Sequence, residues 1–162
     1  MNLKMENNKN LIGIDAERAR ELAGKLNELL ANFQVFYTNV HGFHWNVKGE
    51  QFFELHAKFE ELYNYAFQKI DEIAERIRTL GYAPQHAYSA YLEQSQIKEA
   101  TSVSNGRENV QQILNSLQIL LQTERHIQRL AHAAADEGTS NMIGNYIQEQ
   151  EKMMWMYAAY LK

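Results

Sequence analysis

The sequence predicts an all-α four-helix bundle, and three observations carry that prediction. The chain has 162 residues but only one proline and eight glycines, and so few chain breakers favour long helices over a many-turned β protein. Apolar residues recur at alternating spacings of three and four along four long segments. About two dozen residues between the second and third segments lack this pattern. We therefore expect two helical hairpins joined by one long crossover.

The first hairpin follows a short polar start. Residues 1–14 are mostly polar and contain several asparagines and lysines, so we expect a flexible N-terminal tail there and a single bundle domain over 15–162. Asp15 can cap a first helix that runs to about Phe43. Residues 46–49 leave room only for a short turn, so the next helix must return antiparallel beside the first.

The second helix is expected over roughly 51–80, where Gly81 and Pro84 end it. A short helix is expected near 86–93, inside the crossover. The third helix carries its apolar positions over 110–134 and the fourth over 143–161, with the sequence DEGTS as the turn between them.

Composition excludes several classes of protein and site. Cysteine is absent, which rules out disulfides and thiolate metal sites and leaves nitrogen and oxygen as ligands. The early apolar run over 11–14 is too short for a secretory signal or a membrane span, so we expect a cytoplasmic protein. The net charge of −4 argues against a globular surface built for nucleic acid, although a basic arm could act separately.

Two ligand pairs recur along the second helix. His56 and Glu60 stand four residues apart, as do Asp71 and Glu75, so each pair projects from one side of the helix. His44, just before the turn, is placed close to His56. Glu60 and Asp71 lie about 16 Å apart along a helix, whereas iron or zinc ligands lie about 2.0–2.3 Å from the metal. One helix therefore cannot close a site around a single ion.

Two copies of this helix, running antiparallel, would bring the two pairs together. A two-fold axis near Tyr65 and Ala66 would then generate two equivalent intersubunit sites. The helix has one fully apolar stripe for its own core, and a second stripe that mixes aromatic residues with the candidate ligands. The apolar stripe comprises Phe52, Leu55, Phe59, Leu62, Ala66, Ile70, Ile73, Ile77 and Leu80, and the second His56, Glu60, Tyr63, Phe67, Asp71 and Ala74.

Other readings of these residues compete with an intersubunit iron site. A lone pair at this spacing is usually an ordinary surface pair on an acidic helix, and the second pair together with His44 shifts the balance toward a site. Imidazole and carboxylate serve zinc as well as iron. A di-iron centre inside one bundle is disfavoured, because no glutamate here is followed by histidine in the Glu-x-x-His pattern.

Several motifs together resemble the Dps family, the DNA-binding proteins from starved cells. They are HWNVKG, F-x-x-L-H-x-x-F-E, the D-x-x-x-E of Asp71 and Glu75, GYAP and EKMMWM, and the resemblance covers nearly the whole chain after the tail. It implies a ferritin-like four-helix bundle that assembles into a hollow dodecameric shell. It also implies a ferroxidase that oxidises Fe(II), preferably with hydrogen peroxide, and stores the ferric mineral inside.

The same resemblance assigns roles to individual residues. His44, His56, Asp71 and Glu75 match the family's ferroxidase ligands at a dimer interface. Glu60 falls where the family usually has Asp, and its longer side chain can still ligate iron. Whether Glu60 binds a second iron directly or through water stays open.

Further candidates have two readings each. Trp45 matches a tryptophan beside the family's site that can intercept oxidising equivalents, or is an amphipathic anchor at a helix end. His41 is an auxiliary ligand or a helix-end histidine bonded to backbone. Asp136 and Glu137 resemble acidic residues that line iron-entry pores, or form a polar turn.

Two other regions have a single expectation. We expect His126 and the charged residues beside it, Glu124 among them, to form solvated surface. Trp155 and the methionines around it are expected to pack in the core.

Three functions remain open from the sequence. The first is a ferroxidase and iron store that protects the cell from oxidative damage. The second is a structural nucleoid protein that coats DNA with little ferroxidase activity, although we expect DNA binding to be weak or absent, since Lys4 and Lys9 are opposed by Glu6. The third is a helical scaffold whose site holds zinc or nothing.

Overall fold

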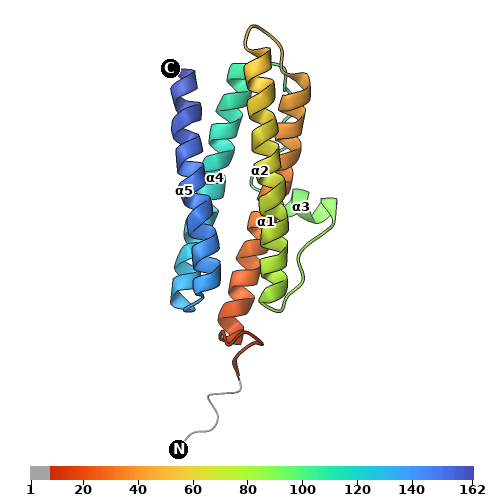
Figure 1. Ribbon diagram of the computed structural model, residues 1–162. Helices are drawn as coiled ribbons and strands as arrows, with labels where there is room; N and C mark the ends of the chain where they lie inside the picture. The colour runs from red at the N-terminus through yellow and green to blue at the C-terminus, as the bar shows by residue number, and fades with distance from the viewer. Residues whose placement is uncertain (1–7) are drawn as a thin grey trace, which may run out of the picture.

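A computed structural model describes residues 8–162 as an antiparallel four-helix bundle (Figure 1). The helices are α1 (Ala16–Asn46), α2 (Phe52–Thr79), α3 (Tyr88–Gln94), α4 (Gly106–Ala133) and α5 (Glu137–Leu161). α1 packs against α2 and α4 against α5, and α1 also contacts α4. The short helix α3 stands beside α1 within the long crossover. No strand occurs within residues 8–162, so the predicted all-α bundle of two hairpins is confirmed.

Side-chain caps and one glycine set the helix ends. Asp15 Oδ1 accepts the backbone N–H of Arg18 at 3.1 Å, which confirms the expected cap of α1. Asn105 and Asp136 cap α4 and α5 in the same way. Gly81 follows α2 with a φ of +96°, a backbone conformation that glycine adopts without steric cost, and so ends that helix as expected.

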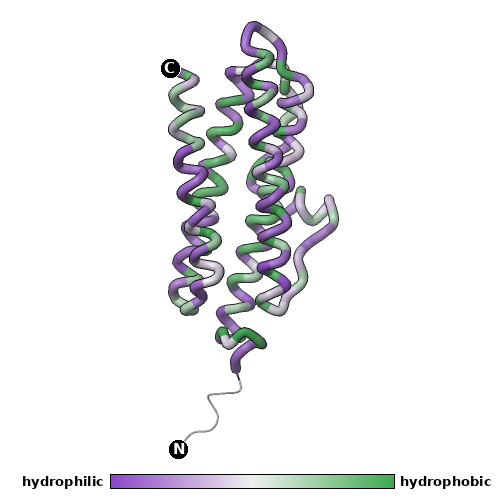
Figure 2. The backbone as a smooth tube through the Cα atoms, viewed as in Figure 1, coloured by the Kyte–Doolittle hydropathy of each residue, from purple (hydrophilic) through white to green (hydrophobic). Residues whose placement is uncertain are grey.

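The core lies along the apolar stripe predicted for α2. The hydropathy of the chain alternates around each helix (Figure 2). Phe59, Ala66, Ile73, Ile77 and Leu80 are fully buried. They pack with the aromatic and aliphatic residues of α1 and α4 in a single cluster. The expected division of α2 into a core face and a second, more exposed face is therefore confirmed.

Two asparagines of α1 hold the crossover against the bundle. Asn32 Oδ1 accepts the backbone N–H of Gln96 at 2.8 Å and that of Ile97 at 3.2 Å. Asn39 donates to the carbonyl of Lys98 at 2.8 Å. The crossover has little regular secondary structure to pair its backbone groups. These side-chain bonds satisfy some of the N–H and C=O groups that would otherwise be unpaired.

Some helix boundaries differ from those expected. α1 continues to Asn46 rather than ending near Phe43. α4 begins at Gly106, ahead of the first strongly apolar position. α5 begins at Glu137, so most of the DEGTS sequence forms its first turn and not a loop. Apolar periodicity marks where a helix meets the core, whereas the capping side chains mark where the helix begins.

The described part of the expected tail lies against the bundle. Residues 1–7 fall outside the described residues. Asn10 donates its side-chain N–H to the carbonyl of Leu80 at 3.2 Å, and Ile14 is buried in the core cluster. Within residues 8–162, no helix combines the length and apolar character needed to cross a membrane.

Candidate metal-binding site

α2 carries four of the five candidate ligands on one unbroken helix. His56, Glu60, Asp71 and Glu75 all lie between Phe52 and Thr79, as predicted. His56 is half-buried, while the three carboxylates are exposed. His44 lies in the last turn of α1 and is buried. The turn after α1 brings it beside the first turns of α2.

His44 and His56 hold each other through reciprocal hydrogen bonds. The Nδ1 of His44 lies 2.7 Å from the backbone oxygen of His56, and the Nδ1 of His56 lies 2.8 Å from the backbone oxygen of His44. The two rings stack with centroids 3.8 Å apart and 14° between their planes. The antiparallel crossing of α1 and α2 is what allows this exchange.

This arrangement fixes the chemistry of both rings. A carbonyl oxygen can only accept, so each Nδ1 carries a hydrogen and donates it. A neutral ring of this tautomer has its lone pair on Nε2. Such a bond from the second ring nitrogen is what orients histidine ligands in metal sites. The Nε2 atoms of His44 and His56 are therefore the ring atoms that could hold a metal ion.

The three carboxylates have no partners in the part of the chain that is described. No hydrogen bond or ion pair from residues 8–162 reaches the side-chain oxygens of Glu60, Asp71 or Glu75. Nor does any group of three or more His, Asp or Glu residues in that range come close enough to hold a metal ion. One chain thus presents a histidine set and a separate carboxylate set, and the prediction that two subunits combine them stays a prediction.

An aromatic cluster borders the histidine pair. The Tyr63 ring lies edge-on to the His44 ring, with centroids 5.2 Å apart. Its centroid lies 4.0 Å from that of the His41 ring. His41 stacks flat on Trp45, with centroids 4.9 Å apart and 2° between the planes. Phe67, one turn beyond Tyr63, is 60% exposed, and Trp45 is 69% exposed. Aromatic rings that one chain leaves open beside ligand-type residues are typical of an interface.

His41 lacks the backbone hydrogen bond expected of a helix-end histidine, and its role as an auxiliary ligand stays a prediction. No backbone hydrogen bond to its ring is present among residues 8–162, and its ring is instead packed between Tyr37 and Trp45. Burial, with the nearby His44 adding to it, lowers the pKa of His41 below its ordinary value. His41 is therefore an uncharged member of the aromatic cluster at neutral pH.

Tyr65 and Ala66, expected close to the two-fold axis, face the interior of their own bundle, and the position of the axis stays a prediction. Ala66 is fully buried in the bundle's own core. The hydroxyl of Tyr65 lies 3.3 Å from the side-chain amide of Gln150 on α5, inside the same bundle. At this height along α2, the residue that reaches the surface beside the ligands is Phe67.

The two acidic residues considered as pore-lining differ from each other. Asp136 is 3% exposed and forms an ion pair with Arg76 at 2.6 Å, while also capping α5. Its carboxylate is therefore committed to the fold, and the pore-lining role is wrong for it. Glu137 is exposed in the first turn of α5 and keeps the expected role as a prediction.

Sequence reasoning missed a buried polar cluster between α2, α4 and α5. Glu124, expected on a solvated surface, is 0% exposed. Lys69 and Gln150 are also buried. A signal was present, because Glu124 follows Leu120 by four residues and precedes Ile127 by three, which places it in the apolar register of α4.

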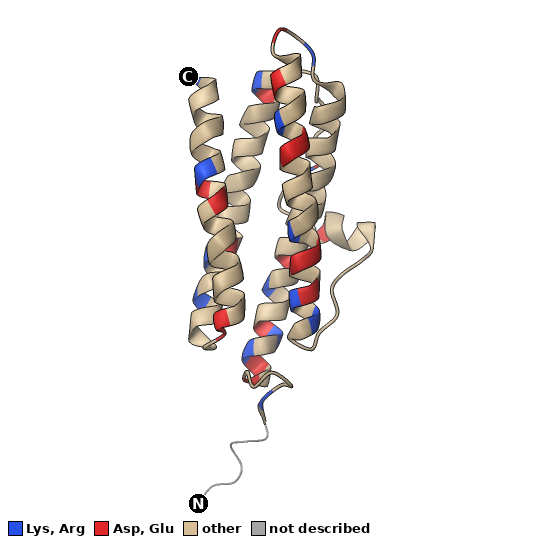
Figure 3. Ribbon diagram, viewed as in Figure 1, with Lys and Arg blue, Asp and Glu red and all other residues tan. Residues whose placement is uncertain are grey.

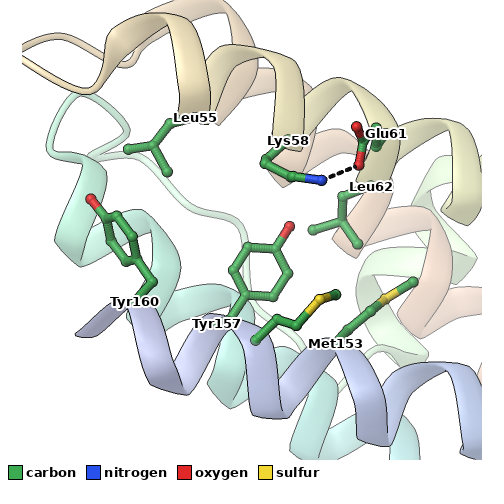
Figure 4. Close-up of a pocket in the computed structure, with 8 residues that line it drawn as sticks. Leu55, Lys58, Glu61, Leu62, Met153, Tyr157 and Tyr160 are labelled. Atoms are coloured by element: carbon green, nitrogen blue, oxygen red, sulfur yellow. Dashed lines mark hydrogen bonds and ion pairs between the residues drawn. The ribbon is translucent and has the colours of Figure 1, made fainter. Parts of the chain in front are cut away.

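The C-terminal part of α5 also differs from expectation. Trp155 and Met156 are exposed rather than packed in the core, although Met153 and Met154 are half-buried against it. An apolar groove of about 270 Å³ lies nearby between α2 and α5 (Figure 4). Its lining includes Leu55, Leu62, Met153, Met156, Tyr157 and Tyr160, with the Lys58–Glu61 ion pair at its edge. It contains none of the candidate ligands.

Charged residues of both signs alternate along α2 (Figure 3). Lys58 pairs with Glu61 at 2.8 Å on its exposed side. This mixture of signs agrees with the acidic net charge in arguing against a basic nucleic-acid surface on this helix.

Comparison with known proteins connects this geometry to a family. Residues 23–162 match the ferritin-like domain. An uncharacterized protein of Haemophilus influenzae is 54% identical over 151 residues, which span 93% of this chain and 94% of that protein. The DNA protection during starvation protein of Porphyromonas gingivalis is 36% identical over 148 residues, spanning 91% of this chain and 93% of that one.

A solved structure shares the whole bundle. The crystal structure of a Dps protein from Vibrio cholerae O1 superposes with a TM-score of 0.94 at 52% identity, covering 96% of this chain and 98% of that chain. It is described as a member of a broad superfamily of ferritin-like diiron-carboxylate proteins.

Proposed function

We propose that this chain, which belongs to the Dps group of the ferritin-like family, is a ferroxidase that oxidises Fe(II) at sites shared between two subunits. The proposal includes a hollow dodecameric shell, located in the cytoplasm, that stores the ferric product. Hydrogen peroxide is the preferred oxidant. The protein thereby removes two reactants, Fe(II) and peroxide, that together damage the cell.

The reciprocal hydrogen bonds between His44 and His56 are the observation that best supports this proposal. Among the described residues no hydrogen bond reaches the Nε2 of either ring, while each Nδ1 is bonded to backbone at 2.7 and 2.8 Å. A structural role for this pair would need neither free nitrogen. Two pre-oriented imidazoles, one buried and one half-buried, are half of a site for a divalent metal ion.

The other half is supplied by Asp71 and Glu75 of a second subunit. These carboxylates are exposed on the same helix, and no side-chain partner within residues 8–162 engages them. Carboxylate and imidazole together suit iron in both oxidation states involved. Glu60, one turn from His56, can reach a second iron directly or through water.

Paired oxidation of Fe(II) by peroxide balances in electrons. Two Fe(II) ions give up one electron each, and together these reduce one hydrogen peroxide, with two protons, to two water molecules. Fe(II) is the substrate, and the ligand residues hold two ions close enough to react with one oxidant. A paired reaction avoids the single-electron step that would release hydroxyl radical.

Anaerobic titration with Fe(II), followed by peroxide, tests this function. We expect the intact protein to consume one peroxide for every two Fe(II) ions, and the His56→Ala and Asp71→Ala variants to oxidise Fe(II) at least about tenfold more slowly. Glu54→Ala, an exposed carboxylate on the same helix, is the matched control. Normal rates in both ligand variants, or tight zinc binding with no Fe(II) oxidation, would overturn the proposal.

A further inference from the structure

The interior of the bundle contains a buried carboxyl that the iron chemistry does not use. Glu124 of α4 is 0% exposed, and its Oε1 accepts the side-chain N–H of Gln150 from α5 at 2.6 Å. The other oxygen, Glu124 Oε2, has no hydrogen-bond partner among the described residues. Gln150 Oε1, also buried, has none either. Two acceptor atoms of one bonded pair are thus left unsatisfied.

The buried cation of this cluster, Lys69, is already engaged by other carboxylates. Lys69 of α2 lies 3.5 Å from Glu72 and 3.5 Å from Glu149. Its ammonium also lies over the rings of Tyr65 at 5.0 Å and Tyr146 at 4.7 Å. Lys69 carries one positive charge against these two carboxylates, so an ionised Glu124 would add a buried charge to a negative charge that is already in excess.

No other helix supplies Glu124 with a counter-charge of its own. Arg125, its neighbour on α4, points to solvent and pairs with Glu151 at 2.6 Å. α1 contributes the apolar ring of Phe33 against Tyr146, 6.4 Å between centroids. Burial raises the pKa of Glu124 to about 8, and Glu149 adds to this, while the hydrogen bond from Gln150 and the charges of Arg125 and Lys69 oppose it.

A proton on Glu124 would turn one of the two unsatisfied acceptor oxygens into a hydrogen-bond donor. A carboxylic acid and a primary amide can pair through two hydrogen bonds, in which the acid donates to the amide oxygen and the amide donates to the acid oxygen. The amide-to-acid bond is present at 2.6 Å. A hydrogen on Glu124 Oε2 would make that oxygen a donor, which is the role that the second bond requires. Without it, both oxygens bear the full cost of burial without a partner.

We propose that Glu124 and Gln150 form a proton-binding site in the bundle interior, where Glu124 is a neutral carboxylic acid in the folded chain at neutral pH. The ligand is a single proton per chain. The site lies between α2, α4 and α5 and shares no residue with the histidine and carboxylate sets that face the second subunit.

The site couples folding to pH. A glutamate in an unfolded chain loses its proton near pH 4.3, so between about pH 5 and pH 8 the folded chain holds a proton that the unfolded chain does not. Stability is then greatest at the acidic end of this range and falls as pH rises toward 8. The equilibrium constant for unfolding increases by up to about tenfold per pH unit there.

Infrared spectroscopy of the assembled, full-length protein tests the site directly. The carbonyl stretch of a protonated carboxyl is separate from the bands of carboxylates. We expect wild-type protein at about pH 6.5 to show one buried acid band that disappears as the pH is raised past about 8 to 9. Glu124→Gln should lack this band, while Glu151→Gln, a half-exposed carboxylate paired with Arg125, should retain it.

Stability measurements give a second readout at one fixed protein concentration. Glu124→Gln should lose the pH dependence of unfolding between about pH 5 and 8, and Glu151→Gln should keep it. If Glu124→Gln does not fold, the wild-type band and its pH titration still decide the matter. The proposal is overturned if wild-type protein has no acid band at about pH 6.5, or if Glu124→Gln retains it.

Discussion

Arg76 and Asp136 join the C-terminal half of α2 to the start of α5 through a nearly buried ion pair. The guanidinium donates to Asp136 Oδ1 at 2.6 Å and to Thr139 Oγ1 at 2.9 Å. Asp136 in turn accepts the backbone N–H of Thr139 at 3.0 Å as the cap of α5. One carboxylate therefore fixes both the beginning of a helix and its contact with another.

Replacing Arg76 with Ala should destabilise the bundle, because Asp136 would remain buried without its cation. We expect a loss of roughly 3–5 kcal/mol in the free energy of unfolding. Arg78→Ala is the matched control, since Arg78 is exposed and, within residues 8–162, its side chain donates only to the backbone carbonyl of Tyr82, at 3.3 Å. Chemical denaturation of both variants at one protein concentration makes the comparison, and equal losses would contradict the assigned role of the pair.

Phe67→Asp should prevent two subunits from pairing through α2. The side chain is 60% exposed on the same face as the candidate ligands, so a charge there meets the partner rather than the chain's own core. We expect a folded, helical protein of lower mass that no longer oxidises Fe(II) rapidly. Gln68→Asp adds the same charge at the next exposed position, about 100° further round the helix from Phe67, and should assemble normally. Sedimentation and circular dichroism distinguish the outcomes; a fully assembled Phe67→Asp shell would be evidence against this interface.

Glu60→Ala tests whether this carboxylate holds a second iron. Glu60 is exposed one turn after His56, where it can add an oxygen ligand beside the histidine pair. We expect the variant to bind fewer Fe(II) ions per site in anaerobic titration while keeping its helical content. Glu54→Ala, six residues before Glu60 and also exposed, should leave the stoichiometry unchanged. Identical titration curves for both would remove Glu60 from the site.

DNA binding should be weak at about 0.15 M salt and neutral pH. Each chain carries −4, so a dodecamer would carry about −48, which repels a polyanion beyond the reach of the few basic residues near the N-terminus. Acidification charges histidines and should relax the repulsion. Gel-shift assays with linear DNA across about pH 6 to 8 measure this trend. Tight retardation at pH 8 would mean that the N-terminal lysines outweigh the net charge.

The parts of this fold that follow from periodicity and capping could be predicted from the sequence. The apolar stripe of α2 identified its core face, and Asp15 and Gly81 marked helix ends, because both signals act over a few neighbouring residues. The placement of His56 and Glu60 on one helix followed from spacing alone.

Other features depend on contacts between distant segments. The reciprocal bonds of His44 and His56 require the backbone geometry of the α1–α2 turn, which no spacing rule supplies. Glu124 was expected in solvent because of its charge, although its register is apolar. Trp155 was expected in the core, yet the apolar residues around it are too continuous to show which side of α5 is buried.

Co-assembly of two impaired variants, His56→Ala and Asp71→Ala, tests the shared site most directly. In a two-fold pair of one His56→Ala chain and one Asp71→Ala chain, one site lacks both residues and the other retains both. After the two chains are unfolded and refolded together, we expect rapid peroxide-driven Fe(II) oxidation at about a quarter of the wild-type sites.

The control is a chain carrying both substitutions, refolded with the His56→Ala chain, because no intact site can form in that mixture. The account predicts activity in the first mixture and none in the second. If the first mixture stays as inactive as its components, although mass measurements show that mixed dimers have formed, the ligands do not come from two subunits and the central claim is wrong.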